Sequence, residues 1–282
     1  TSAAAEVELV PPAREGDTSF AARELVARER GERACDVWEP LSRGCELRGD
    51  DEEAVRDLGT GERYSYVQVA ARAERVGTWL RETVRPGGRV GIMTPNCAIA
   101  MEAHFAAAWA ERVALNCNPR LSAEETAYVL EGARAEVLVV DPCYADLVAA
   151  ALATTRQLAV RSVAWTSSAA ATTTSAGEEL RYETIAGGSA GRRAFAADDD
   201  AGAEMYYTSG TSGRPKGVVL SRRNVVLHAL GCCVEHRLKA EDVWLHAAPM
   251  FHLVDAYAMF SITWVGGTHV TIPAFSAAAV AQ

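Results

Sequence analysis

Short apolar runs alternate with helix-like stretches along most of the chain, and this alternation restricts the folds open to it. Val137–Val140 is apolar at every position, which is typical of a parallel strand buried on both faces of its sheet. Strands that alternate with helices indicate an α/β protein with doubly wound, mainly parallel sheets and flanking helices. We expect strands at Arg89–Met93, Arg112–Asn116, Glu136–Asp141, Val160–Trp165, around Tyr206, at Val243–Ala247 and at Thr268–Ile272.

Local sequence patterns predict where several helices and strands begin or end. The segment 54–64, with Gly-Thr-Gly at its centre, predicts a hairpin. Gly132 is expected to cap the C-terminus of the helix before it. Two serines have the spacing of capping boxes, Ser65 with Gln68 and Ser122 with Glu125. Other helices are expected over Phe20–Arg30, Cys97–Ala110, Tyr144–Leu152, from Ser221 onward and over Leu253–Val265.

These elements divide the chain into four parts. Residues 1–50 form an N-terminal extension with the first helices, and 51–165 a first α/β subdomain. Residues 166–203, rich in Ser, Ala, Thr and Asp, are expected to be a connection with at most one short helix, near Tyr182. Residues 204–282 begin a second α/β subdomain.

Composition excludes several classes of protein. The net charge of −9 argues against broad nucleic-acid binding. Seven cysteines without a C-x-x-C pair argue against a disulfide framework and favour reduced thiols in an intracellular protein. No apolar run reaches the ~20 residues of a membrane span, and no targeting segment is evident. Because the chain starts at Thr1, we expect it to be processed or a fragment.

The stretch from Thr208 to Gly217 has the composition of a polyphosphate-binding loop. Its glycines let backbone N–H groups approach a ligand, and its hydroxyl side chains add donors. Lys216 supplies a point charge suited to phosphate. We place this loop at a strand-to-helix turn at the carboxyl edge of a sheet, where ligands of such sheets bind.

Two other interpretations of the loop are weaker. A Walker loop ends in Gly-Lys-Ser/Thr, whereas Lys216 lies between Pro215 and Gly217, and this argues against an unrelated phosphate-binding NTPase. A flexible Gly/Ser linker has the same composition, but it does not require Pro-Lys at a fixed place after a strand.

The loop resembles the phosphate-binding signature of the adenylate-forming superfamily, which includes acyl- and aryl-CoA synthetases. Over Tyr207–Gly217 the match is nearly complete, with Ser212 where threonine is commoner. The resemblance extends over roughly residues 53–282, because further segments follow in the family's order. These are Tyr64–Tyr66, Arg89–Met93, Asn118–Ser122 and Pro249–His252. The family's later elements, including its C-terminal small domain, are not seen, so the chain resembles the front part of an acyl-CoA synthetase and is expected not to make acyl-CoA alone.

The resemblance implies ATP and Mg²⁺ as cofactors, with a carboxylic acid and CoA as substrates. It implies that Thr208 binds Mg²⁺, that Lys216 screens the departing pyrophosphate, and that His252 lies beside the reacting carboxylate. The implied phosphate-binding residues are Thr208, Ser209, Gly210, Thr211, Ser212, Gly213, Lys216 and Gly217.

The acid itself is left open between fatty and aryl types, with a fatty acid as the leading hypothesis. Asp255 stands where the family has glycine. Tyr257, Phe260 and Trp264 have helical spacing, which is more often core than ligand site, although the resemblance implies that some line the acyl site. The other histidines are interpreted as ordinary core or surface residues. An alternative function is a non-catalytic nucleotide-binding module.

Overall fold

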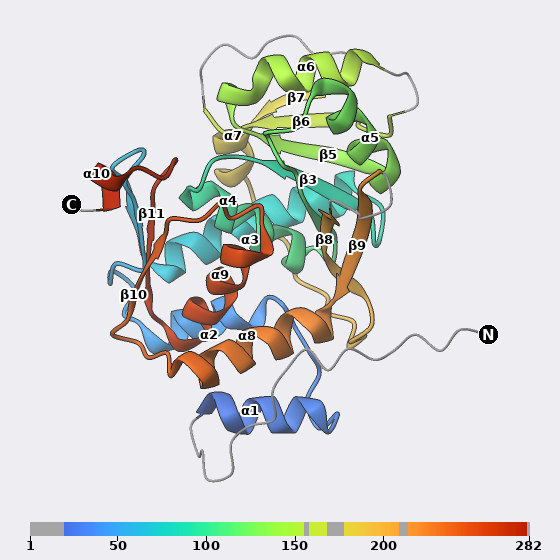
Figure 1. Ribbon diagram of the computed structural model, residues 1–282. Coiled ribbons are helices and arrows are strands. Elements are labelled where there is room, and N and C mark those ends of the chain that lie inside the picture. The colour runs from blue at the N-terminus through green and yellow to red at the C-terminus, as the bar shows by residue number, and fades with distance from the viewer. Residues whose placement is uncertain (1–19, 155–157, 168–177, 209–213, 281–282) are drawn as a thin grey trace.

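In the computed structural model of the protein, residues 20–154, 158–167, 178–208 and 214–280 are described. They form two sheets with helices packed against them (Figure 1). The larger sheet has the order β7-β6-β5-β3-β4-β8-β9, and the smaller has the order β10-β11-β1-β2. The strands of the larger sheet are β3 (Arg89–Met93), β4 (Val113–Asn116), β5 (Ala135–Val140), β6 (Ser162–Trp165), β7 (Glu178–Arg181), β8 (Gly202–Thr208) and β9 (Lys216–Ser221). Those of the smaller are β1 (Val55–Asp57), β2 (Arg63–Tyr64), β10 (Val243–His246) and β11 (Thr268–Thr271).

Neighbouring strands are parallel except in the pairs β1–β2 and β8–β9. The helices are α1 (Phe20–Glu29), α2 (Glu39–Leu47), α3 (Tyr66–Thr83), α4 (Ala98–Trp109), α5 (Ala123–Ala133), α6 (Ala145–Thr154), α7 (Tyr182–Ala186), α8 (Arg222–His236), α9 (Leu253–Val265) and α10 (Ala277–Val280). The predicted α/β class with mainly parallel sheets is confirmed. Among the described residues, no helix has both the length and the apolar composition to cross a membrane.

Strand β5 shows why the larger sheet carries helices on both faces. All six of its residues are buried. Val137 and Val139 belong to the core cluster that contains α3 and α4, whereas Leu138 and Val140 belong to the cluster that contains α5 and α6. Successive side chains of a strand point to opposite faces, so an unbroken apolar run requires a helical layer on each face.

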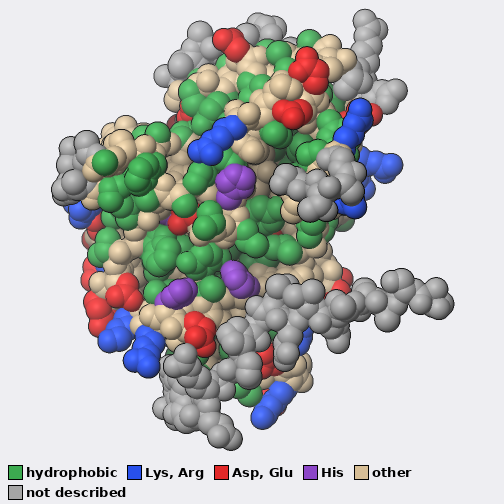
Figure 2. Space-filling view, viewed as in Figure 1, with side chains coloured by type: hydrophobic (Ala, Val, Ile, Leu, Met, Phe, Trp, Pro, Cys, Tyr) green, Lys and Arg blue, Asp and Glu red, His purple; other side chains and the backbone are tan. Residues whose placement is uncertain are grey.

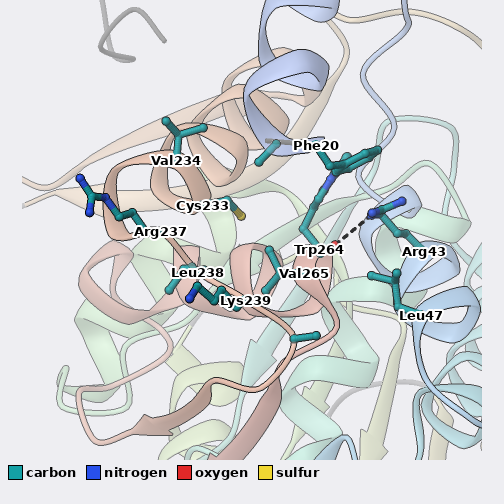
Figure 3. Close-up of a pocket in the computed structure, with 12 residues that line it drawn as sticks. Phe20, Arg43, Leu47, Cys233, Val234, Arg237, Leu238, Lys239, Trp264 and Val265 are labelled. Carbon is teal, nitrogen blue, oxygen red and sulfur yellow. Dashed lines mark hydrogen bonds between the residues drawn. The ribbon is translucent and has the colours of Figure 1, made fainter. Parts of the chain in front are cut away.

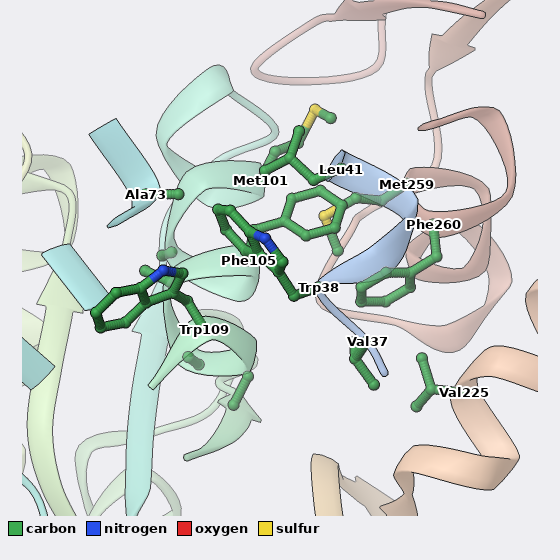
Figure 4. Close-up of a cluster of buried hydrophobic side chains, with 14 of the residues drawn as sticks. Val37, Trp38, Leu41, Ala73, Met101, Phe105, Trp109, Val225, Met259 and Phe260 are labelled. Carbon is green, nitrogen blue, oxygen red and sulfur yellow. The ribbon is translucent and has the colours of Figure 1, made fainter. Parts of the chain in front are cut away.

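Aromatic packing joins the first of these layers to α9. The ring of Trp38 lies 6.4 Å from that of Phe105 on α4, and the Phe105 ring lies 5.6 Å from that of Phe260 on α9, both edge to face (Figure 4). Such pairs contribute about 0.5–1.5 kcal/mol beyond their buried area. Helix α9 is thereby fixed against the interior of the protein.

The two sheets draw strands from distant parts of the chain. The β1–β2 hairpin, predicted over 54–64, is present, and β1 pairs in parallel with β11, with Val55 opposite His269. Strands β8 and β9 complete the larger sheet beside β4. Both sheets therefore contain segments from the range 51–165 and from the range 204–282.

Both predicted capping boxes are present, at Ser65 and Ser122, but the predicted cap at Gly132 is wrong. Gly132 lies inside α5, and Arg134 caps the helix in the left-handed conformation with φ 52°. A Cβ at position 132 would lie 2.6 Å from the Tyr207 hydroxyl oxygen. Glycine is therefore explained here by close packing against β8.

Two strands were missed. β7 falls within the predicted connection 166–203, and its sequence, Glu-Glu-Leu-Arg, is polar because it forms a sheet edge. β9 lies between the phosphate-binding loop and α8. The loop therefore joins two antiparallel strands, and its predicted place at a strand-to-helix turn is wrong.

Candidate active site

The predicted phosphate-binding loop lies between the two strands of a hairpin at the edge of the larger sheet. Thr208 ends β8, Lys216 begins β9, and these two residues are opposite each other in the ladder. Both are exposed. The other predicted phosphate-binding residues of the loop, Ser209, Gly210, Thr211, Ser212 and Gly213, lie outside the described residues, whereas Gly217 is the second residue of β9.

Helix α5 supports the base of this hairpin. The Tyr128 hydroxyl donates a hydrogen bond to the Pro215 carbonyl oxygen at 3.2 Å. The Arg214 guanidinium lies 5.3 Å from the centre of the Tyr128 ring, and the Tyr207 ring packs edge to face on it at 6.4 Å. The residues on the C-terminal side of the loop, Arg214 and Pro215, are therefore held against α5 by the Tyr128 side chain.

His252 caps the N-terminus of α9 with its backbone and leaves its ring exposed. Its side chain makes no capping hydrogen bond. The ring lies 4.4 Å from that of Phe251, measured between centroids. Partial burial, and then the nearby Arg120 charge, lower the pKa of His252 below its usual value, so the imidazole is neutral at pH 7.

The segment that carries His252 is held by a buried asparagine. Asn96 donates from Nδ2 to the carbonyl oxygens of His246 at 2.8 Å and Ala248 at 2.7 Å, and its Oδ1 accepts from the Met250 N–H at 2.8 Å. These bonds satisfy the backbone of an irregular segment that would otherwise lose its hydrogen-bond partners on burial. The connection between β10 and α9 is therefore well positioned before any ligand binds.

One cavity of about 510 Å³ brings Thr208 and His252 together. Pro215, Asn116 and Asn118 also line it, and apolar residues complete its wall. Figure 2 shows histidine side chains within a largely hydrophobic face of the molecule. Lys216 is not among the described lining residues, and its position is defined by its pairing with Thr208.

A smaller cavity of about 150 Å³ adjoins this one and shares Tyr206, Leu220 and Leu253 with it. Ala256, Tyr257 and Phe260 of α9 line it, as do His228 and Val225 of α8. Tyr257 and Phe260 are therefore in place to contact an apolar substituent, whereas Trp264 is not. The space between α8 and α9 suits the apolar part of a ligand whose polar end lies near His252.

A buried carboxylate forms part of the wall of the smaller cavity. Glu204 on β8 is 2% exposed and lies 2.9 Å from His104 Nδ1, while Asn116 Nδ2 donates to its other oxygen at 2.8 Å. The Tyr206 hydroxyl makes a longer contact to Glu204, 3.5 Å, and burial, followed by the carboxylate charge, raises the pKa of Tyr206 well above its usual value. Sequence reasoning missed Asn116 and Glu204; the place of Asn116 at the carboxyl end of a predicted strand was the available signal for that residue.

Comparison with known proteins fits this geometry. Residues 41–282 match the family model described as AMP-binding enzyme. The chain belongs to the AMP-binding enzyme family. It is 35% identical over 243 residues to a long-chain-fatty-acid–CoA ligase of Thermus thermophilus. The matched region covers 83% of this chain and 42% of that protein. It is 33% identical over 239 residues to a feruloyl-CoA synthase of an Amycolatopsis species, with coverage of 80% and 42%.

The fold agrees with that of solved AMP-binding enzymes. The structure of apo MatB from Rhodopseudomonas palustris superimposes with a TM-score of 0.71 at 25% identity, covering 88% of this chain and 47% of that one. The predicted membership of the adenylate-forming superfamily is thus confirmed. The chain spans less than half the length of the curated relatives it matches.

A third cavity in this AMP-binding enzyme lies away from the phosphate-binding hairpin. It measures about 490 Å³ and is lined by residues of α1, α2, α8 and α9 and of the segment that follows α8 (Figure 3). Trp264 lines it, and its carbonyl oxygen accepts a hydrogen bond from Arg43 Nε at 3.2 Å. This cavity shares no lining residue with the one that holds Thr208 and His252, and the sequence motifs do not lead to it.

Proposed function

We propose that this chain forms the ATP- and acid-binding part of an ATP-dependent acid–thiol ligase, an acyl-CoA synthetase. The observation that carries the proposal is the single cavity lined by both Thr208, at the end of the phosphate-binding hairpin, and His252. The 31–35% identity to curated CoA ligases supports the same reaction class. The acid is a fatty or an aryl carboxylic acid.

The reaction has two steps. A carboxylate oxygen attacks the α-phosphorus of ATP, and the bond to the β-phosphate oxygen breaks, releasing pyrophosphate and leaving an acyl-adenylate. The CoA thiol then loses its proton and attacks the acyl carbon, forming a thioester and releasing AMP. The first step brings one anion to another, so the protein must position both groups and neutralise charge in the transition state.

The hairpin residues suit that task. Lys216 is exposed at the start of β9 and is opposite Thr208, so its ammonium group can reach a phosphate bound at the loop. A fixed cation near the departing pyrophosphate stabilises charge that develops in the transition state. The Thr208 hydroxyl suits one oxygen position of Mg²⁺, which commonly binds through substrate phosphates, several waters and one or two protein ligands. When bound, the ion would neutralise phosphate charge.

His252 and the adjoining cavity suit the acid. A neutral imidazole has one N–H to donate to a carboxylate oxygen, and the lowered pKa of His252 keeps it neutral at pH 7. An apolar chain or ring can then extend past Tyr206 and Leu253 toward Tyr257 and Phe260. Burying it there would contribute about 25 cal/mol for each Å² of apolar surface removed from water.

The experiment replaces Lys216 in an enzyme that carries this chain. We expect Lys216→Ala to slow acid-dependent ATP–pyrophosphate exchange about 100-fold or more, because a charge facing the leaving group is lost. Lys216→Arg is the matched control, since it keeps the charge, and it should retain more exchange. An unchanged exchange rate in Lys216→Ala would overturn the assignment of this residue. Binding of Mg·ATP without any exchange would instead indicate a non-catalytic nucleotide-binding protein.

A further inference from the structure

A continuous chain of polar side chains is buried beneath α9. Asp255 Oδ2 lies 2.8 Å from His246 Nδ1, His246 Nε2 lies 3.0 Å from His269 Nδ1, and His269 Nε2 lies 3.0 Å from Thr263 Oγ1. The rings of the two histidines are stacked, with centroids 5.3 Å apart. His246, His269 and Thr263 are 0% exposed and Asp255 is 3% exposed. The chain of bonds connects the first and last turns of α9 to strands β10 and β11.

The direction of each hydrogen bond follows from its last member. Thr263 Oγ1 lies 2.6 Å from the Met259 carbonyl oxygen, a distance at which the hydroxyl must donate. A hydroxyl has one hydrogen, so Thr263 can only accept from His269 Nε2–H. The proton on His269 is thereby fixed on Nε2. Burial, and the neighbouring His246, lower the pKa of His269 well below its usual value, so its Nδ1 is an unprotonated acceptor.

His246 must therefore carry two protons. Its Nε2–H donates to His269 Nδ1, which leaves Nδ1 facing Asp255 Oδ2 at 2.8 Å, a contact that also needs a proton. The carboxylate is the better place for negative charge, because Asp255 lies in the first turn of α9, where the helix dipole favours anions. Trp244 Nε1–H also donates to Asp255 Oδ1 at 3.1 Å.

We propose that Asp255 and the His246 imidazolium form a buried ion pair that positions His252 and the acid-binding face of α9. The inference rests on the proposed function for its catalytic consequence, although not for the ion pair itself. Asp255 follows His252 by three residues, and the His252 carbonyl oxygen accepts from the Asp255 N–H at 3.1 Å. The segment before His252 is thus held by Asn96 through Met250, and His252 itself is held by the N–H of Asp255. Both Asp255 and His246 are positioning residues, which act through His252.

The lining of the smaller cavity depends on the same anchor. Ala256, Tyr257 and Phe260 all lie on α9 between Asp255 and Thr263. The buried pair and the Thr263 hydrogen bond hold the helix at both ends of this segment. A shift of about 1 Å in such a segment can cost up to about 100-fold in rate, because the reacting groups are no longer aligned.

Nuclear magnetic resonance of the chain with ¹⁵N-labelled histidine tests the pair without any need for activity. At pH 7 we expect His246 to have two protonated ring nitrogens and His269 to have one, on Nε2. Through-bond correlations from each histidine ring to its own backbone assign the resonances in the unaltered protein. A singly protonated His246 in the unaltered protein would overturn the proposal, and this measurement does not depend on whether any variant folds.

Asp255→Asn tests the positioning role. We expect His246 to lose its second proton. We also expect the His252 ring resonances to shift, because a displaced His252 ring changes its position relative to the Phe251 ring, whose centroid lies 4.4 Å away. Trp244→Phe is the matched control, because it removes the other donor to Asp255 and leaves the ion pair. It should keep both protons on His246. An Asp255→Asn variant that is folded and has unchanged His252 resonances would refute positioning.

The catalytic consequence is tested in an enzyme that carries this chain. We expect Asp255→Asn to lower the kcat of adenylation about 10-fold with little change in the KM for ATP. If the effect passes through His252, the double variant Asp255→Asn/His252→Ala should be no slower than His252→Ala alone. Additive losses would contradict this route. Absence of adenylation in the unaltered enzyme would refute the proposed function and leave the resonance result standing.

Discussion

Strands β5 and β9 belong to the same sheet and each contains an unbroken run of valine and leucine, yet their environments are opposite. β5 lies between β3 and β6 and is buried at all six positions, whereas β9 forms an edge and is exposed over Lys216–Val219. Val139 is 0% exposed and Val219 is 43% exposed. Position in the sheet, rather than composition, decides which strand stabilises the fold. The edge strand is the one that belongs to the proposed phosphate-binding hairpin.

The difference in burial means that the interior strands stabilise the fold, whereas the edge hairpin is available to bind a ligand. The interior strands bury apolar surface on both faces, which is the main favourable contribution to folding. The hairpin leaves Thr208, Lys216 and Gly217 exposed at the surface, where a ligand can reach them. Substitutions in the two strands should therefore change different measured quantities.

The largest effect on folding is expected in β5. Leu138→Ala should lower the free energy of unfolding by about 2–5 kcal/mol, because it removes a buried side chain and leaves a cavity. Val219→Ala in β9 is the matched control and should cost no more than about 0.5 kcal/mol. Urea unfolding of both variants checks the pair. Equal losses of unfolding free energy in the two variants would show that β9 is as well packed in solution as β5.

An intermediate effect is expected where α5 contacts β8. Gly132→Ala should destabilise the protein by about 1–2 kcal/mol, since the new methyl group would overlap the Tyr207 hydroxyl. In a Tyr207→Phe background the same change should instead stabilise by up to about 1 kcal/mol, because alanine is the better helix former and the overlap is gone. Thermal unfolding of the four proteins measures the reversal. If Gly132→Ala changes the stability in the same direction in both backgrounds, the contact with the Tyr207 hydroxyl is disproved.

The smallest effect is expected at His252. Its pKa is lowered by partial burial and then by Arg120, so Arg120→Gln should move that pKa upward toward about 6.5. Because the folded state disfavours the protonated ring, this contribution to stability is present above the ordinary pKa and is lost as the pH falls below it. Titration of the His252 resonance checks the shift. No change would show that burial alone lowers the pKa, and added salt should reduce the difference, since the ring is exposed.

Local signals predicted much of the fold. The bounds of β3 and α9 agree with the predicted ranges, because Arg89–Met93 and Leu253–Val265 are apolar stretches with clear ends. β9 was missed since Gly217–Leu220 has only a short apolar run after a loop. Its status as a strand depends on pairing with β8, which no local pattern reports.

Only part of the candidate site was predicted, because local patterns do not report contacts between distant segments. Thr208 and His252 were identified through motifs and do share a cavity. The roles of Lys216 and of the loop residues stay predictions. Asp255 was noted only as a departure from the family pattern, because its partners His246 and His269 come together through the pairing of β10 with β11. Such partners depend on long-range structure and have no local signature.

The pairing of Val55 with His269 has a consequence for how the molecule folds. Strands β3, β4 and β5 lie within residues 89–140 and can associate early, since the loops between them are short. β1 can pair only once β11 is in place, and β11 lies more than 200 residues later in the sequence. Contacts between distant segments slow folding. We therefore expect the smaller sheet, and with it the histidine pair beneath α9, to be the last part of the protein to assemble.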